Sequence, residues 1–189
     1  SRGIKSTPYQ SPKVTISKPT IIIIPEYKKP DIKAYKKGLK LVTVKTIRGP
    51  INVQNPQINS LSKLNCILAC IEANKKNADE ALMFDINGNI ATNNSTHFFF
   101  VKNKTVFTST GKYCVTGITR QKIIDICKKN KIKVKEKNFK LNEVLNADEA
   151  FCTGSFAGIV PVNQINKKKY SLKKNPITKE LTNFYNNLF

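Results

Sequence analysis

The sequence predicts a mixed α+β domain. Helical and strand patterns alternate along the chain, without the regular repeat of a doubly wound fold. Apolar residues make up 40% of the 189 positions, which is enough for a sizeable hydrophobic core. The strand patterns are runs of β-branched and aromatic residues between turn residues, and the helical patterns are amphipathic stretches that end in lysine or glycine.

Strands are expected where Val, Ile, Thr and Phe concentrate between turn residues. The run "TIIIIP" at residues 20–25 predicts a buried strand bounded by prolines. Gly88 and the Asn103-Lys104 pair predict two hairpin turns. The other expected strand segments are residues 39–47, 80–85, 89–93, 96–110 (two strands), 132–139 and 149–165 (strand, turn, strand).

The clearest helical pattern covers residues 60–77, with Ser60 or Ser62 as its N-cap and lysines in its last turn. Its apolar residues recur at helical spacing, and we expect them to face the core: Leu61, Leu64, Leu68 and Ile71. Further helices are predicted at residues 31–38, 117–131, 140–148 and 175–189, the last with Pro176 near its start.

The charge balance is strongly basic, with 33 Lys and Arg against 12 Asp and Glu, a net charge of +21. The lysines are spread along the whole chain, and arginine occurs only at Arg2, Arg48 and Arg120. Nucleic-acid modules cluster basic and aromatic residues, so we expect no nucleic-acid partner. The apolar runs are too short for a membrane helix, and no signal peptide is recognised, which predicts a cytoplasmic protein.

The five cysteines are odd in number and lack a repeated metal-binding spacing. Only one histidine, His97, accompanies them, so the sequence predicts no metal site. Buried, reduced thiols are the simpler interpretation.

Two short loops carry glycine next to a hydroxyl residue, "TGITR" at 116–120 and "TGSFAG" at 153–158. The free amides at a helix N-terminus form an anion site, and a hydroxyl adds a further donor. Thr119 and Ser155 are therefore candidates to hold the oxygens of one phosphate. An ordinary helix cap and a tight turn would explain each loop taken alone.

Lys63 stands at the start of the predicted helix in "SLSKLNC". Its ammonium either lies in water or is held inward as an amine for chemistry. Lysine in a first helical turn is disfavoured by the helix dipole, so its presence there favours a functional role for the amine. A lysine in an apolar, cation-rich cleft is more readily neutral, and the neutral amine attacks aldehydes.

Five short motifs follow one another along the chain: "ADEAL", "GITR", "ADEAF", "TGS" and "PV". In this order and spacing the chain resembles the class IV, pyridoxal-phosphate-dependent aminotransferases over about residues 2–189. That family includes branched-chain and D-amino acid aminotransferases and aminodeoxychorismate lyase. The resemblance implies the large pseudo-barrel domain of a fold type IV pyridoxal-phosphate enzyme, with pyridoxal 5′-phosphate as its cofactor.

The resemblance also implies a domain layout. Residues 1–20 would be the end of an interdomain segment, and residues 21–189 the large cofactor-binding domain. The family's small N-terminal domain, with an arginine that binds the cofactor phosphate, is expected to have no counterpart in this chain. These enzymes usually form homodimers, so a homodimer is expected.

Carried over by position, the family's phosphate-binding groups fall at Ile118, Thr119 and Ser155. The backbone amides of Phe156 and Ala157 would then face a substrate carboxylate. Arg2 matches a family arginine that binds the same carboxylate.

Two positions depart from the family pattern. The Schiff-base lysine falls at Asn59 or the residue before it, and the nearest lysine is Lys63, four positions later, which can share a helix face with Asn59. Thr92 stands where the family commonly has a glutamate that pairs with the pyridine nitrogen, so a weaker electron sink is expected. His97 replaces a frequent asparagine and is either a pocket wall or a core histidine.

With Lys63 as the Schiff-base lysine, the resemblance implies a transaminase. It would move an amino group between an amino acid and a 2-oxo acid, with Lys63 as the proton carrier. Two alternatives stay open: a pyridoxal-phosphate lyase of the aminodeoxychorismate lyase type, and a non-catalytic homologue. The sequence does not identify the amino acid substrate.

Overall fold

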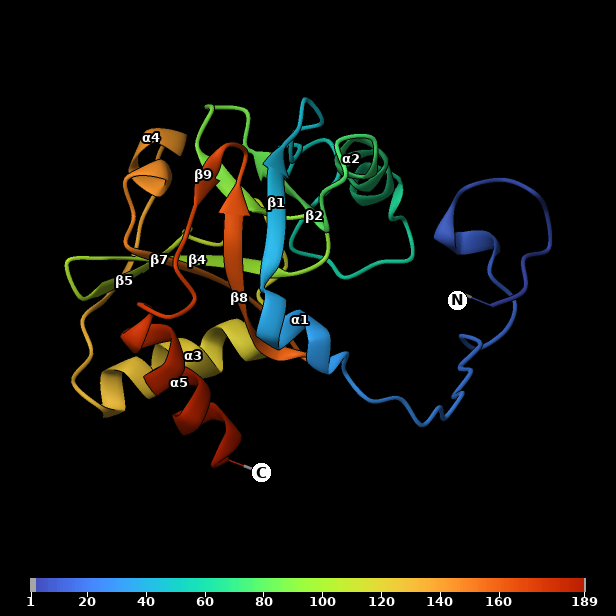
Figure 1. Ribbon diagram of the computed structural model, residues 1–189. Helices are drawn as coiled ribbons and strands as arrows, with labels where there is room; N and C mark the ends of the chain where they lie inside the picture. The colour runs from blue at the N-terminus through green and yellow to red at the C-terminus, as the bar shows by residue number, and fades with distance from the viewer. Residues whose placement is uncertain (1–2, 189) are drawn as a thin grey trace.

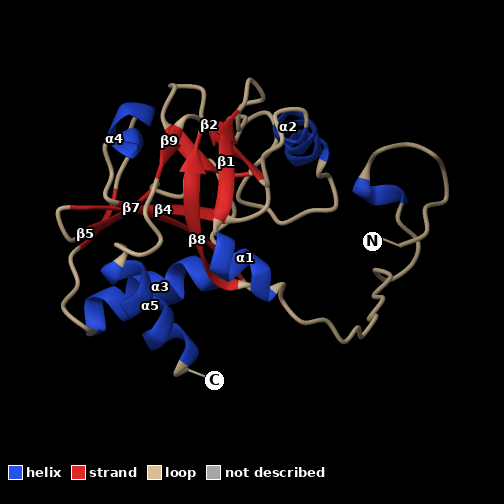
Figure 2. Cartoon of the chain, viewed as in Figure 1, coloured by secondary structure: helices blue, strands red, loops and turns tan. Residues whose placement is uncertain are grey.

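The computed structural model describes residues 3–188, which form a curled β-sheet with helices on its outer surfaces (Figures 1 and 2). The strands in the described part of the chain are β1 (Leu39–Thr43), β2 (Glu80–Phe84), β3 (Ile90–Asn93), β4 (His97–Lys102), β5 (Thr105–Thr108), β6 (Val134–Glu136), β7 (Glu149–Gly154), β8 (Gly158–Ile165) and β9 (Lys168–Lys169).

The strand order is β3-β2-β1-β8-β7-β4-β5-β6, and β9 pairs with β8. β1 runs parallel to β2 and β8, β5 runs parallel to β6, and the remaining pairs are antiparallel. The half that contains β1 and β8 crosses the half that contains β4, β5 and β7 at a steep angle (Figure 1). The expected mixed fold with a barrel-like sheet is thereby confirmed.

Helices α3 (Ile118–Lys129) and α5 (Pro176–Asn186) pack together against β7 and β8, and α2 (Leu64–Asn74) packs against β1 and β2. The shorter helices are α1 (Ile32–Lys37), α4 (Leu141–Leu145) and the 3-10 turn Pro12–Val14. Within the described residues, none of these helices has the length and apolar character needed to span a membrane.

Strand β4 is buried on both faces, because a hydrophobic core lies on each side of it. Side chains alternate along a strand, so successive residues of β4 enter different cores. Phe98 and Phe100 face one core, which also contains Phe139. Phe99 and Val101 face the second core, under α3 and α5. The "FFF" run is therefore a central strand that links the two cores.

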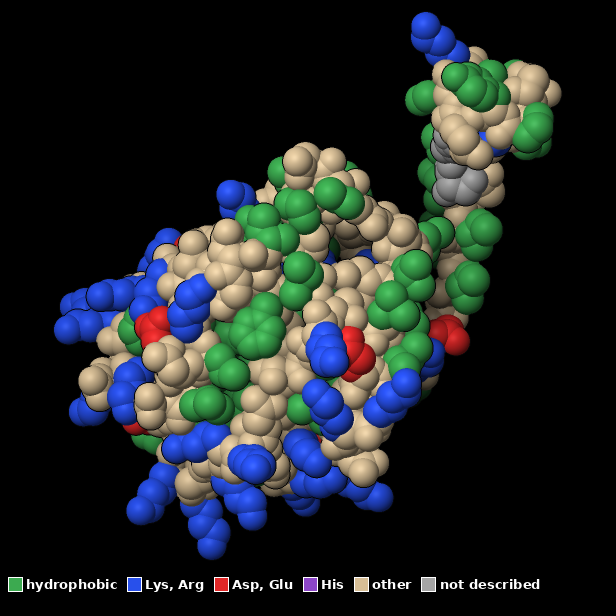
Figure 3. All heavy atoms as spheres, turned by 90° about the horizontal axis from the view of Figure 1, so that it is seen from above, with side chains coloured by type: hydrophobic (Ala, Val, Ile, Leu, Met, Phe, Trp, Pro, Cys, Tyr) green, Lys and Arg blue, Asp and Glu red, His purple; other side chains and the backbone are tan. Residues whose placement is uncertain are grey.

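The predicted strand at residues 20–25 is wrong. The segment is extended but pairs with no strand, and its isoleucines are 75–86% exposed. It belongs to an arm with hydrophobic side chains on its surface (Figure 3). A strand needs a neighbour for its backbone hydrogen bonds, and none lies beside this run in the described chain. The domain boundary expected at residue 21 stays a prediction.

The predicted orientation of the helix at residues 60–77 is also wrong. The side chains expected inside are 44–95% exposed, and Ala69 and Ala73 are buried instead. Small alanines allow α2 to lie close to the sheet, so the larger apolar residues point outward. The N-cap is Lys63, not Ser60 or Ser62, and no side chain caps the helix there.

We expect replacement of Phe99 by Ala to lower the free energy of unfolding by about 3–5 kcal/mol. The ring is fully buried and stacks on Phe151, with their centroids 5.0 Å apart. Urea denaturation measures this loss. Ile22→Ala is the control, because Ile22 is 75% exposed and its truncation should cost less than about 0.5 kcal/mol. Equal losses for the two variants would contradict the placement of β4 in the core.

Candidate active site

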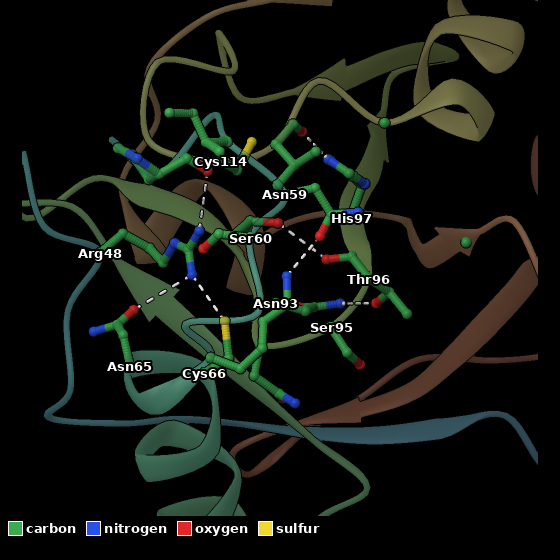
Figure 4. Close-up of a pocket in the computed structure, with 18 of the residues that line it drawn as sticks. Arg48, Asn59, Ser60, Asn65, Cys66, Asn93, Ser95, Thr96, His97 and Cys114 are labelled. Carbon is green, nitrogen blue, oxygen red and sulfur yellow. Dashed lines mark hydrogen bonds between the residues drawn. The ribbon is translucent and has the colours of Figure 1, made fainter. Parts of the chain in front are cut away.

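A cavity of about 600 Å³ opens between the start of α2, the β3–β4 loop, the start of α3 and the turn after β7. Arg48, Asn65 and Cys66 lie on one side of it, and Thr96 and His97 on the other (Figure 4). These groups come from segments far apart in the sequence, which the curled sheet brings to one place.

Five of the catalytic and cofactor-binding residues predicted from the sequence line this cavity: Lys63, Thr92, Ile118, Thr119 and Ser155. Phe156 and Ala157 lie in the adjoining turn but are not among the lining residues. Phe156 is 59% exposed, and the carbonyl of Ala157 accepts a 2.6 Å hydrogen bond from the Tyr35 hydroxyl. Arg2 lies outside the described residues.

The N-terminus of α3 faces the cavity through Gly117, Ile118 and Thr119. Its N-cap is Gly117, and no side chain caps it. The first amides of a helix have no intrahelical acceptor and carry partial positive charge. The buried Thr119 and the exposed Ser155 add hydroxyl groups at the same wall. The arrangement suits an anion with several oxygens, such as phosphate.

Arg120 fixes this helix start from the protein interior. Its guanidinium donates to the Ser109 carbonyl at 2.6 Å and to the Glu136 carboxylate at 2.7 Å. These two bonds tie α3 to the end of β5 and to β6. Arg120 is only 3% exposed and does not line the cavity, so it is not a ligand contact.

His97 packs against the turn that precedes α3. Its Nε2 lies 2.5 Å from the Val115 carbonyl oxygen, so Nε2 carries the proton and donates it. Burial lowers the pKa of His97 below its usual value, the hydrogen bond to Val115 opposes this, and nearby Arg120 and Arg48 lower it further. The ring is thus a neutral wall of the cavity, one of the two roles expected from the sequence.

The Lys63 amine lies beside Asn59, the position at which the resemblance places the Schiff-base lysine. Its Nζ donates a 2.6 Å hydrogen bond to Asn59 Oδ1. Lys63 is exposed, but both residues line the cavity. The amine is therefore within reach of the cavity without any change of fold.

The β3–β4 loop is held by one buried carboxylate. Glu80, 7% exposed, accepts hydrogen bonds from Ser95, from Thr96 Oγ1 at 2.5 Å and from Asn93 Nδ2 at 3.1 Å. Burial raises the pKa of Glu80 above its usual value, although these hydrogen bonds act in the opposite direction. Glu80 itself does not line the cavity, but it fixes three residues that do.

Arg48 is a lining residue that sequence reasoning missed. Its guanidinium is 8% exposed and donates only to neutral groups: the carbonyls of Tyr113 (3.0 Å) and Pro56 (3.4 Å), Asn65 Oδ1 (3.3 Å) and Cys66 Sγ (3.0 Å). The available signal was that Arg48 is one of three arginines in a lysine-rich chain. No motif around it pointed to a site.

Two buried polar atoms at the cavity have no hydrogen-bond partner, Asn93 Oδ1 and Thr153 Oγ1. Such atoms are costly unless a ligand or water completes them. The Thr153 hydroxyl and the open amides of α3 can donate to an anionic ligand, whereas Asn93 Oδ1 can only accept a hydrogen bond. The residues present therefore fit a cofactor that carries a phosphate.

We expect Gly117→Ala to destabilise the protein by about 1–3 kcal/mol. The added Cβ would lie 2.4 Å from His97 Cε1, which is too close for any contact. The backbone of Gly117 has φ −73°, so Ala is otherwise tolerated. His97→Ala has its own cost, because it removes the hydrogen bond to Val115, but in that background the change Gly117→Ala should cost little. Thermal unfolding measures Gly117→Ala, His97→Ala and the double variant.

Gly49→Ala is the matched control, because nothing lies within 4 Å of its added Cβ. It should be neutral or slightly stabilising. If Gly117→Ala costs as much in the His97→Ala background as it does in wild type, the clash with His97 is contradicted.

The raised pKa of Glu80 predicts a pH-dependent contribution to stability. The folded protein binds this proton more tightly than the unfolded chain, so the contribution falls as the pH rises above about 4.5. Urea denaturation at several pH values should show the unfolding free energy of wild type, relative to Glu80→Gln, decreasing as the pH rises above about 4.5. A difference that is independent of pH would contradict the raised pKa.

Comparison with known proteins gives a consistent result. The sequence model described as amino-transferase class IV matches residues 3–165. A branched-chain-amino-acid aminotransferase-like protein 2 of Arabidopsis thaliana is 34% identical over 189 residues, which is 100% of this chain and 34% of that protein.

Two solved structures share the fold. The branched-chain aminotransferase of Thermoproteus uzoniensis with norvaline has a TM-score of 0.76 and 27% identity, over 79% of this chain and 50% of that one. An aminotransferase of Brucella abortus bound to the cofactor PLP has a TM-score of 0.77 and 26% identity, over 87% of this chain and 56% of that one.

The chain thus spans between about a third and just over half of the length of these relatives. The family match nevertheless covers most of the chain and includes the motifs that build the cavity. The chain belongs to the class IV aminotransferases.

Proposed function

We propose that this chain is the cofactor-binding domain of a pyridoxal-phosphate-dependent aminotransferase that uses Lys63 as its Schiff-base lysine. The observation that carries the proposal is the position of the Lys63 amine. It is hydrogen-bonded to Asn59 at 2.6 Å and shares one cavity with the uncapped N-terminus of α3. A reactive amine and a phosphate site are the two groups that this cofactor requires.

The phosphate would bind the amides of Ile118 and Thr119 and the hydroxyl groups of Thr119 and Ser155. Thr92, 4% exposed, would contact the ring by its hydroxyl. When bound, the cofactor supplies an electron-withdrawing ring that makes the proton on the substrate Cα acidic. The naming of PLP as the ligand of the Brucella abortus aminotransferase supports this assignment.

Lys63 has two tasks in this proposal. Its Nζ would hold the cofactor through its aldehyde group, and when free the same Nζ would act as the general base for the proton on the substrate Cα and as the acid that gives a proton back. Asn59 orients the amine through its side-chain oxygen. The substrates would be an amino acid and a 2-oxo acid, with the amides of Phe156 and Ala157 directed to the substrate carboxylate.

We also propose a homodimer. Leu64, Ile67 and Leu68 on the outward side of α2 are 46–68% exposed, and this apolar surface borders the cavity through Ile67. An apolar surface of this kind is typical of a protein contact. A second copy of the chain would cover it.

The test is to incubate the protein with pyridoxal phosphate, reduce it with borohydride and locate the modified peptide by mass spectrometry. We expect the label on Lys63, because only this lysine lies among the described residues that line the cavity. Lys63→Ala should lose the label, and Lys75→Ala, at the exposed far end of α2, should keep it.

An unlabelled wild-type protein would refute the Lys63 assignment and favour a non-catalytic homologue. For a labelled protein, amino-acid turnover with and without an added 2-oxo acid distinguishes two reactions. A transaminase needs the acceptor for repeated turnover, whereas a lyase that releases pyruvate does not.

A further inference from the structure

The cavity is lined by cationic and neutral groups. Among its described lining residues, the charged side chains are Arg48 and Lys63, and none carries a carboxylate. The other titratable groups that line it are His97, Cys66, Cys70 and Cys114. His97 is neutral at pH 7 because its pKa is lowered, and burial raises the pKa of the Cys114 thiol, which keeps that sulfur uncharged as well.

The acids on the surrounding strands are already engaged. Glu80 on β2 accepts hydrogen bonds from Ser95, Thr96 and Asn93, which separate it from the cavity. Glu136 on β6 pairs with Arg120 at 2.7 Å. Neither carboxylate lines the cavity, so neither is available to a ligand without breaking these contacts.

Thr92 offers a neutral contact only. Its hydroxyl donates to the Thr96 carbonyl at 3.0 Å, which leaves an uncharged oxygen toward any neighbour. The Thr92 side chain also hydrogen-bonds Cys114, and the charges of Arg120 and Arg48 act on that thiol. The charged groups that act on the thiol beside Thr92 are thus both cations.

We propose that this cavity holds the ring nitrogen of pyridoxal phosphate without a proton. The inference rests on the proposed function, since it concerns the cofactor of that same site. A protonated ring would carry a positive charge with no carboxylate among the described lining residues to pair with it, whereas the buried guanidinium of Arg48 adds a like charge that disfavours it. No described lining residue is an anion, and Thr92, the contact proposed for the ring, is neutral.

A neutral ring withdraws electrons less strongly than a protonated one. The acidity of the substrate Cα proton then depends more on the Lys63 amine and less on the ring. The site is thereby specialised for proton transfer close to Lys63, at the expense of reactions that need a strong electron sink.

The first experiment uses the whole chain loaded with pyridoxal phosphate that is 15N-labelled in the ring. We expect the bound nitrogen at pH 7 to resonate as a neutral pyridine. A resonance typical of a pyridinium would overturn the inference while leaving the proposed function intact. A chain that binds no pyridoxal phosphate would overturn both.

The second experiment measures binding of two ring analogues by equilibrium dialysis. One is the 1-deaza analogue, in which C–H replaces the nitrogen, and the other is the permanently cationic N-methyl analogue. We expect the deaza analogue to bind within about threefold of the natural cofactor, and the N-methyl analogue to bind about tenfold more weakly or worse.

The variants Thr92→Glu and Thr92→Gln separate charge from size. The two new side chains have nearly the same shape, so any steric effect of the N-methyl group is common to both. A carboxylate should raise the affinity ratio of the N-methyl to the deaza analogue by about tenfold over that in Thr92→Gln. Equal ratios in the two variants would show that charge near Thr92 does not control the ring nitrogen, and the inference would fail.

Discussion

The pairing of β4 with β7 is the constraint on which the cavity depends. His97 lies opposite Thr153, and Phe99 lies opposite Phe151. A shift of one residue would exchange the two faces of β4, and both faces are buried in separate cores. The register is therefore fixed by packing, and it places the β3–β4 loop beside the turn after β7. The start of α3 completes the cavity against these two segments.

Three buried ionisable residues hold the remaining parts of this arrangement. Glu80 ties the β3–β4 loop to β2, Arg120 ties α3 to the strands beside it, and Glu149 caps α5 by accepting the amides of Ile177 (3.1 Å) and Thr178 (2.7 Å). A buried charge is costly unless several hydrogen bonds surround it. Each of these residues therefore favours one position for the segments it joins, which makes the cavity a rigid feature of the fold.

The parts of the structure that sequence could predict are those with a local signal. Gly88 with φ 69° and Asn103 with φ 48° occupy the predicted hairpin turns, and α3 begins directly after Gly117 as expected. The phosphate-binding candidates were found because the amides that bind an anion follow from the helix start itself. The resemblance to a family then supplied the identity of the ligand, which local patterns do not encode.

The wrong or missed predictions share one physical cause. In each, the structure of a segment depends on contacts with parts of the chain that are distant in sequence. The isoleucine run at 20–25 looks like a strand, but strands are defined by their neighbours. The outward side of α2 is apolar, and only the burial of Ala69 and Ala73 shows which side meets the sheet. Arg48 contacts groups between 8 and 65 positions away, so no short window of sequence contains its environment.

The difference between backbone groups and side chains also bears on which features of the family persist in the chain. An anion site made of backbone amides survives side-chain substitution, because any residue supplies the same N–H. The groups that would direct the chemistry are side chains, and the resemblance to the family marks two of those as changed, at Asn59 and Thr92. In the proposed function, phosphate binding would therefore be the property least sensitive to substitution. Proton transfer would be the most sensitive one, because it would depend on a single amine, that of Lys63, which donates one hydrogen bond to Asn59.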